Sequence, residues 1–208
     1  TAARVFARID AGALTDDSLD ALAAEFDLSA RQLRRVVEQE YGVSPVQLAQ
    51  TRRLLLAKQL IADTQLPMAD VAFAAGFSSV RRFNHLFRSR YGMNPTAMRR
   101  GTAAAEAGRV VLKLGYRPPL HWEGLAGFLS SRGATVVERV DRGVYRRTVQ
   151  VGETTGWLQA EPDTGKHQLR LTVSESLVPM LRHLLSGVRH LFDLNASPAA
   201  IDAYLGQD

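Results

Sequence analysis

The sequence predicts a two-domain protein: an all-α unit with two helix-turn-helix motifs, followed by a small α+β domain with an antiparallel sheet and helices on one face. Two similar segments, LDALAAEFDLSARQLRRVVEQEYGVSP and MADVAFAAGFSSVRRFNHLFRSRYGMNP, lie about fifty residues apart in the first half. Alternating apolar and polar runs follow residue 109, which is typical of strands. The small residues of GTAAAEAG, 101–108, predict a linker between domains at 1–100 and 109–208.

The turn of each repeat has the residues that a helix-turn-helix motif needs. The second helices align at an offset of 50 residues and the first helices at 49, so the second turn is one residue longer. Gly76 can adopt the positive φ that ends a helix sharply, and Asp27 is a tolerable substitute in the first repeat. Ser29, Ser78 and Ser79 can cap the N–H groups that open the second helices.

The second helix of each repeat is the predicted reading helix, because its apolar side faces inward and leaves a mostly basic face outside. Leu33 and Val37 in one repeat match Phe83 and Phe87 in the other at helical spacing. Arg can donate to guanine O6 and N7, Asn can pair with adenine, and Val can contact a thymine methyl group. The predicted base-contacting residues are Arg31, Arg34, Arg35, Val80, Arg81, Asn84 and His85.

A second set of basic and hydroxyl side chains near these helices is suited to phosphate contacts. On a single helix such arginines would be an ordinary solvated face, and Arg34 and Glu38 have the i, i+4 spacing of a surface ion pair. The repetition of the same turn, buried spacing and basic face favours DNA binding instead. The predicted phosphate-contacting residues are Ser29, Ser78, Ser79, Arg88, Arg90, Arg99 and Arg100.

Positive charge is concentrated in the region of the two repeats. Residues 28–100 contain twelve Lys or Arg and four Asp or Glu, a net charge of +8, whereas the whole chain carries +5. The remainder is therefore acidic on balance. This asymmetry is expected of a module that follows DNA phosphates, and it predicts binding that weakens as salt rises.

Between the repeats, Ser44 and Pro45 are the expected N-cap and first-turn residues of a long helix that ends near Ala62. At about 1.5 Å per residue this helix spans about 27 Å, enough to hold two reading helices in successive major-groove segments about 34 Å apart. One monomer would then read two half-sites. The predicted apolar side of this helix consists of Val46, Leu48, Leu54, Leu55, Leu56, Leu60 and Ile61.

Residues 1–100 resemble the DNA-binding domain of the AraC/XylS family of transcription regulators. The most specific segments are VAFAAGFSSVRRFNHLFRSRYGMNP and SPVQLAQTRRLLLAKQLI. The resemblance implies a seven-helix unit, double-stranded DNA as the partner and RNA polymerase as a further one, and the family's base contacts fall on the seven residues named above. The family varies freely at positions 30 and 31, so the operator sequence does not transfer.

Several strands and helices are expected in residues 109–208. The segments VVLKLGY, ATVVERV, VYRRTVQV and HQLRLTV alternate as strands do, and Trp157–Glu161 is a further expected strand. Amphipathic spacing predicts helices at 120–131, 178–191 and 198–205. The order strand, helix, several strands, helix is typical of an α+β domain.

This second half resembles the N-terminal domain of the inducible 3-methyladenine DNA glycosylases, most specifically in VRHLFDLNASPAAIDAYLG. In that family the sheet domain precedes a helix-hairpin-helix catalytic domain. The two resemblances occur in the order found in the middle of a bacterial adaptive-response fusion protein of the Ada/AlkA type. The chain is therefore expected to be a fragment of a longer polypeptide, and a glycosylase catalytic domain of the same parent is an expected partner.

No enzymatic activity is predicted for the chain itself. It contains no cysteine, so it lacks the zinc site and the methyl-accepting thiolate of the first domain of such a fusion. It also has no helix-hairpin-helix segment with a catalytic Asp. The five histidines have no metal-ligand spacing. We therefore predict no catalytic residue, no metal and no cofactor.

Three interpretations of function remain open at this stage. The first is a sequence-specific regulatory module of an alkylation-damage response protein. The second is the non-catalytic, DNA-gripping part of a 3-methyladenine DNA glycosylase. The third is an AraC-type regulator with a C-terminal effector domain for small molecules, in which Trp122, Glu123 and Trp157 would form a cage for a cation, although such tryptophans are more often core residues.

The sequence carries no sign of membrane insertion or secretion. No apolar run approaches the length of a membrane span, and no charged start followed by an apolar stretch marks a secretory signal. A cytoplasmic location is expected, because the predicted partner is DNA.

Overall fold

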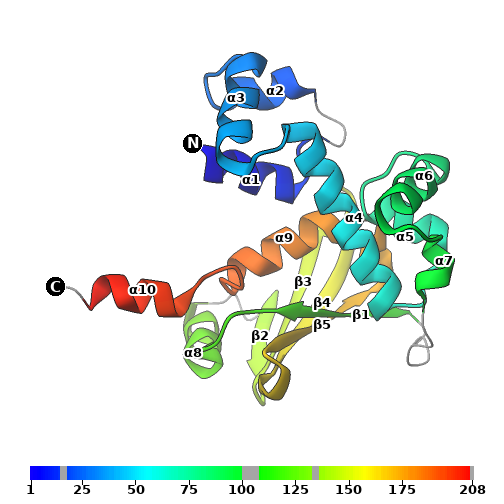
Figure 1. Ribbon diagram of the computed structural model, residues 1–208. Coiled ribbons are helices and arrows are strands. Elements are labelled where there is room, and N and C mark those ends of the chain that lie inside the picture. Colours follow the sequence, from blue (N-terminus) through cyan, green and yellow to red (C-terminus); the bar gives the residue numbers. More distant parts are fainter. Residues whose placement is uncertain (15–17, 100–107, 133–135, 207–208) are drawn as a thin grey trace. The chain divides into compact units, whose positions relative to one another are not determined.

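The computed structural model describes residues 1–14, 18–99, 108–132 and 136–206 (Figure 1). It contains two compact units, one formed by Thr1–Thr102 with Leu181–Ser186 and the other by Ala103–Met180 with Gly187–Asp208. Arg100 and residues 101–107 of the predicted linker lie outside the described residues.

The first unit is all-α, as predicted. Helices α2 and α3 form the first helix-turn-helix motif, and α5 and α6 form the second. The long helix α4 connects them; it contacts α3 of the first motif and α5 of the second, and also the flanking helices α1 and α7 (Figure 1). The helices are α1 (Ala2–Ala11), α2 (Leu19–Ala24), α3 (Ala30–Tyr41), α4 (Pro45–Asp63), α5 (Met68–Ala74), α6 (Val80–Tyr91) and α7 (Pro95–Met98).

Helix α4 begins at Pro45, as predicted, and ends at Asp63, one residue past the predicted end. A reciprocal cap defines its start, because Ser44 Oγ accepts the Gln47 N–H at 3.3 Å and Gln47 Oε1 accepts the Ser44 N–H at 3.0 Å. Two predicted core positions are wrong, since Val46 and Leu55 are 47% and 46% exposed. Because different helices contact α4 along its length, no single apolar side of it is buried throughout.

Each motif has buried residues that fix the rotation of its second helix. In the second motif, Phe83 and Phe87 are fully buried with their ring centroids 5.5 Å apart, and Phe77 lies 5.3 Å from Phe83. Burial of each such ring stabilises the fold by about 1.5–3 kcal/mol, so the opposite side of α6 must face outward. The core of the first motif includes Val5, Ile9, Leu22, Leu33 and Val37.

The second unit contains a five-stranded antiparallel sheet in the order β1-β5-β4-β3-β2, so the predicted α+β class is confirmed. One face of the sheet is buried: Leu112, Leu158 and Leu171 are at most 2% exposed. Phe192 packs on this side against Tyr145 and Trp122, with ring centroids 5.4 and 5.2 Å apart. The strands are β1 (Arg109–Gly115), β2 (Glu138–Asp141), β3 (Val144–Val151), β4 (Thr154–Asp163) and β5 (Gln168–Ser174).

Several element boundaries in this unit differ from the predicted ones. Strand β2 starts at Glu138 rather than 134, and residues 133–135 lie outside the described residues. The predicted helix 178–191 is a 3₁₀ turn over Glu175–Met180 followed by α9 (Leu181–Leu191). Pro179 lies inside the 3₁₀ turn and has no N–H to donate, so the α-helix starts only after it.

The remaining helices are α8 (Trp122–Arg132), which starts two residues later than predicted, and α10 (Pro198–Leu205), which has the predicted bounds. Helix α8 contacts the edge strand β2, whereas α10 has no buried residue. Within the described ranges, none of the helices combines the length and the apolar character that a membrane span needs.

Candidate DNA-binding surface

Both motifs use the same backbone turn between their two helices. Asp27 and Gly76 follow the first helices with φ angles of 56° and 88°. The next residue donates its N–H to a carbonyl of the preceding helix, at 3.1 Å from Leu28 and 3.0 Å from Phe77. The predicted equivalence of Asp27 and Gly76 is confirmed. Left-handed backbone is natural for Gly and tolerated by Asp, so the backbone can reverse sharply at this point in both motifs.

The reading helices α3 and α6 both begin at a serine N-cap, but the two caps differ. Ser29 Oγ accepts the Gln32 N–H at 3.3 Å, and Gln32 Oε1 accepts the Ser29 N–H at 2.8 Å. Ser79 Oγ accepts the Arg82 N–H at 3.4 Å, but a guanidinium group cannot accept the reciprocal bond. Of the two serines predicted as caps of α6, Ser79 is the N-cap, and Ser78 lies in the turn before it.

The two reading helices expose the same pattern of positions. Each is 12 residues long and ends at a glycine with a φ of 69°. From Arg31 in α3 and Arg81 in α6, the exposed, half-buried and buried positions follow in the same order. All the predicted base-contacting residues lie on the outer side. Arg31, Arg34, Arg35, Arg81, Asn84 and His85 are exposed, and Val80 is half-buried.

Of the arginines predicted to contact phosphate, only some have a guanidinium group that is accessible at the surface. Arg90 is exposed. Arg88 is also exposed, and Asn94 Oδ1 accepts its Nε and Nη2 at 2.9 and 2.6 Å. Arg99 is half-buried, and its Nη2 donates to the Leu66 carbonyl. Arg99 therefore ties α7 to the loop after α4, which a sequence pattern does not reveal.

Two of the basic residues on α4 interact within the protein. Arg52 forms an ion pair with Asp10 of α1, and Arg53 donates to the Leu14 carbonyl. The net charge of residues 28–100 included both of these arginines and was interpreted as a DNA-binding surface. Since both side chains are only partly exposed, the accessible positive charge is concentrated on α3 and α6.

Arg82 is a candidate site residue that the sequence pattern did not single out. It is exposed near the start of α6 and lines a pocket of about 140 Å³ together with Ser78. A cation is unfavourable at this end of a helix, where the dipole is positive. The sequence did contain a sign of this. Arg82 aligns with Gln32, whose side chain caps the first reading helix, whereas an arginine at that position cannot accept the same hydrogen bond.

The proposed cation cage of the second domain is wrong. Trp122 is a buried core residue whose Nε1 donates to the Gly143 carbonyl at 2.7 Å. Trp157 is 40% exposed and precedes Leu158, which points into the core, so its indole lies on the opposite face of the sheet. Among the described residues, no group of three or more His, Asp or Glu could hold a metal ion.

Comparisons with known proteins match both halves of the chain. A family described as Helix-turn-helix domain matches residues 22–101, and one described as AlkA N-terminal domain matches residues 111–208. Among solved structures, the chain is similar to the C-terminal domain of AraT, a response regulator from Geobacillus stearothermophilus. The similarity covers 51% of this chain and 88% of the AraT chain, with 26% sequence identity and a TM-score of 0.46.

Two curated relatives resemble different extents of the chain. The probable bifunctional transcriptional activator/DNA repair enzyme AlkA of Mycobacterium tuberculosis is 36% identical over 99% of this chain and 42% of its own length. DNA-3-methyladenine glycosylase 2 of Escherichia coli is 35% identical over 45% of this chain and 33% of its own. The chain thus spans less than half of each relative. It consists of an AraC-type helix-turn-helix DNA-binding domain followed by an AlkA N-terminal domain, and it is homologous to a bifunctional transcriptional activator and DNA repair protein.

Proposed function

We propose that this chain is a sequence-specific regulatory module of an alkylation-damage response protein, in which α3 and α6 read two adjacent major-groove segments of double-stranded DNA. The observation that carries this proposal is the shared exposure pattern of the two reading helices. Two segments with different sequences keep the same buried positions and leave the same outer positions to polar side chains. A merely solvated surface does not require this correspondence.

The two reading faces differ in chemistry, so the two half-sites should differ in sequence. Helix α3 presents Arg31, Arg34 and Arg35, which are suited to guanine O6 and N7. Helix α6 adds Asn84 and Val80, which are suited to adenine and to the thymine methyl group. We expect a G-rich half-site under α3 and a half-site with A·T pairs under α6.

Phosphate contacts are assigned to exposed or half-buried groups at the ends of the reading helices. Arg88 and Arg90 lie in the last turn of α6, and Ser29, Ser78 and Ser79 lie at the helix starts, where N–H groups also favour anions. Arg82 joins this set, because it lines one pocket with Ser78 and a phosphate bound there would offset the unfavourable position of a cation at a helix start. Arg99 and Arg100 also remain proposed phosphate-contacting residues, with a smaller expected contribution to binding.

The wider setting of the module is also a proposal. The resemblance to both relatives supports a parent polypeptide that carries a 3-methyladenine glycosylase domain, with residues 101–108 as a linker between domains at 1–100 and 109–208. RNA polymerase and that catalytic domain are the proposed protein partners, and the proposed location is the cytoplasm. The match of residues 111–208 to the AlkA N-terminal domain favours this setting over a small-molecule effector domain.

A selection of bound duplexes from a random pool, at low and at moderate salt, tests the proposed function. We expect a bipartite motif whose two halves are about one helical turn apart, roughly 10 base pairs. If binding instead yields no motif and merely collapses as salt rises, the unit is a nonspecific DNA grip for a repair enzyme.

Substitutions on the two reading helices test the assigned roles on the selected duplex. We expect Arg34→Ala and Arg81→Ala each to relax base choice in one half-site and to cost about 1–3 kcal/mol in binding. Arg90→Ala is the matched control, since loss of a phosphate contact should weaken specific and random duplexes alike. Equal losses on both kinds of duplex for all three variants would overturn the roles.

A further inference from the structure

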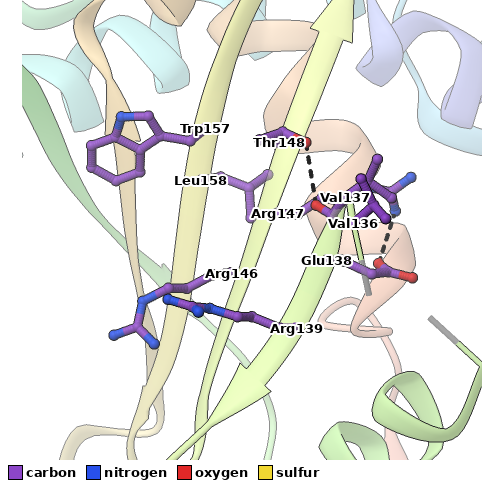
Figure 2. Close-up of a pocket in the computed structure, with 9 residues that line it drawn as sticks. All are labelled: Val136, Val137, Glu138, Arg139, Arg146, Arg147, Thr148, Trp157 and Leu158. Carbon is purple, nitrogen blue, oxygen red and sulfur yellow. Dashed lines mark hydrogen bonds and ion pairs between the residues drawn. The ribbon is translucent and has the colours of Figure 1, made fainter. Parts of the chain in front are cut away.

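A pocket of about 320 Å³ lies at the β2 edge of the sheet in the second unit (Figure 2). Its volume is at the lower end of the range for small-ligand pockets, about 300–1,000 Å³. Figure 2 shows Arg139 of β2, Arg146 of β3 and Trp157 of β4 pointing to the same side of the sheet, whereas Arg147 and Glu138 point to the other. The pocket therefore has a basic, aromatic side outside the domain core.

Two like charges oppose each other across the strands of this pocket. Arg139 and Arg146 are direct partners in the β2–β3 register, an arrangement that destabilises an antiparallel sheet when nothing compensates for it. Gln159 Oε1 accepts from Arg146 Nε at 3.2 Å, but the Asp141 carboxylate is 3.8 Å from Nη1, too far for a hydrogen bond. Among the described residues, Nη1 has no hydrogen-bond acceptor. An anion between the two guanidinium groups would remove the repulsion.

The acidic residue that lines the pocket does not neutralise these two arginines. Glu138 accepts a hydrogen bond from the Tyr145 hydroxyl at 2.5 Å, and its carboxylate is 3.4 Å from the Arg147 guanidinium group. Both partners lie on the core side of the sheet. On the outer side, the exposed Asp141 carboxylate lies 3.8 Å from Arg146 and balances part of this charge. Arg139 and Arg146 together still carry a net positive charge there and can donate to a phosphate group.

Trp157 gives the same side of the pocket an aromatic face. Its indole is 40% exposed, and its backbone N–H donates to Ser174 Oγ at 3.1 Å, which fixes the strand at this residue. The preceding Gly156 is required there, since a Cβ atom would lie 2.3 Å from Ser174 Oγ. An indole beside guanidinium groups is the combination that stacks a base and neutralises its phosphate.

We propose that this pocket binds an unpaired nucleotide of single-stranded nucleic acid, with the base stacked on Trp157 and a phosphate held by Arg139 and Arg146. A duplex offers no free base face to the indole, and an acidic peptide would use the arginines but leave the indole without a partner. The site is separate from the helix-turn-helix surface and goes beyond the function proposed for that surface.

Binding of a fluorescein-labelled oligothymidine of about eight nucleotides to the whole chain tests the site. We expect Trp157→Ala to raise its Kd by about 5- to 150-fold, because stacking on one aromatic residue is worth about 1–3 kcal/mol per base. Arg146→Ala should raise the Kd by about tenfold, because it removes a charge-assisted hydrogen bond to the phosphate. Trp157→Phe should retain most of the affinity, since it keeps an aromatic face. The exposed Arg139→Ala should also weaken binding and lower the salt slope by about 0.7, and it tests the site even if Trp157→Ala fails to fold.

Matched controls separate this site from nonspecific charge and from the reading helices. Arg170→Ala removes one exposed guanidinium group from the same sheet face, beside Glu161 at 3.8 Å, and should leave the oligothymidine Kd unchanged. Arg34→Ala should weaken duplex binding only. The proposal is overturned if Arg170→Ala or Arg34→Ala weakens oligothymidine binding as much as Arg146→Ala, if Trp157→Ala has no effect, or if poly-glutamate binds as tightly as oligothymidine.

Discussion

At the scale of single residues, Tyr145 links the sheet-domain core to its edge strand. Burial, aided by the hydrogen bond to Glu138, raises its pKa to about 12, whereas a phenol in an unfolded chain titrates near pH 10. Folding therefore favours the neutral phenol. The resulting stability is fully present below about pH 10 and is lost as pH rises through about 12.

We therefore expect Tyr145→Phe to reduce the fall in the free energy of unfolding as pH rises from about 10 to 12. The wild type should lose about 1–2 kcal/mol more than the variant between about pH 9 and pH 11.5, when both are measured by urea unfolding. Lysines and other tyrosines titrate equally in the two proteins, so the difference isolates Tyr145. Parallel pH profiles would contradict this assignment.

At the scale of elements, the two reading helices start with caps of different strength. Gln32 closes a capping box on α3, whereas Arg82 at the matching position of α6 cannot. We expect Gln32→Ala to lower the free energy of unfolding by about 0.5–1 kcal/mol. Arg82→Ala should change stability by less than about 0.5 kcal/mol but reduce the salt slope of duplex binding by about 0.9, the value for one phosphate contact.

This pair of variants is its own control, since each replaces the same helix position in one motif. Chemical unfolding and duplex titration at several salt concentrations separate the two effects. If Arg82→Ala destabilises the fold while leaving the salt slope unchanged, then Arg82 is a structural residue and the phosphate contact is refuted.

The elements themselves could mostly be predicted from local sequence. The serine caps and Pro45 marked the starts of the reading helices and of α4 to within a residue or two, because capping depends on neighbouring residues only. Strands β3 and β5 had the alternation that a half-buried sheet requires. The start of α9 was predicted wrongly, since apolar spacing continues through the 3₁₀ turn and does not distinguish it from an α-helix.

At the scale of the whole molecule, α4 should set the spacing at which DNA is read. Its 19 residues span about 28 Å, and it contacts helices of both motifs. We expect an insertion of about 5 base pairs between the selected half-sites to raise Kd at least tenfold, because half a turn moves one half-site to the opposite side of the duplex. Fluorescence anisotropy with the original and the lengthened duplex measures this.

An insertion of about 10 base pairs is the informative control for this expectation. This insertion returns both half-sites to the same side of the duplex, but it separates them by more than the distance that α4 spans. The affinity should therefore stay low. Recovery of full affinity at that spacing would mean that the two motifs move independently and that α4 does not act as a spacer.

The sequence alone determined the order of the domains, the two helix-turn-helix motifs, the outward residues of both reading helices and the strands, since all of these follow from periodicity, capping and repetition within short segments. Only the tertiary structure decided which polar side chains are already engaged. Arg52 pairs with Asp10 forty-two residues away, Arg99 donates to Leu66, and Trp122 and Trp157 lie on opposite faces of one sheet. Partners of this kind are brought together by packing between distant segments, and local patterns carry no information about that packing.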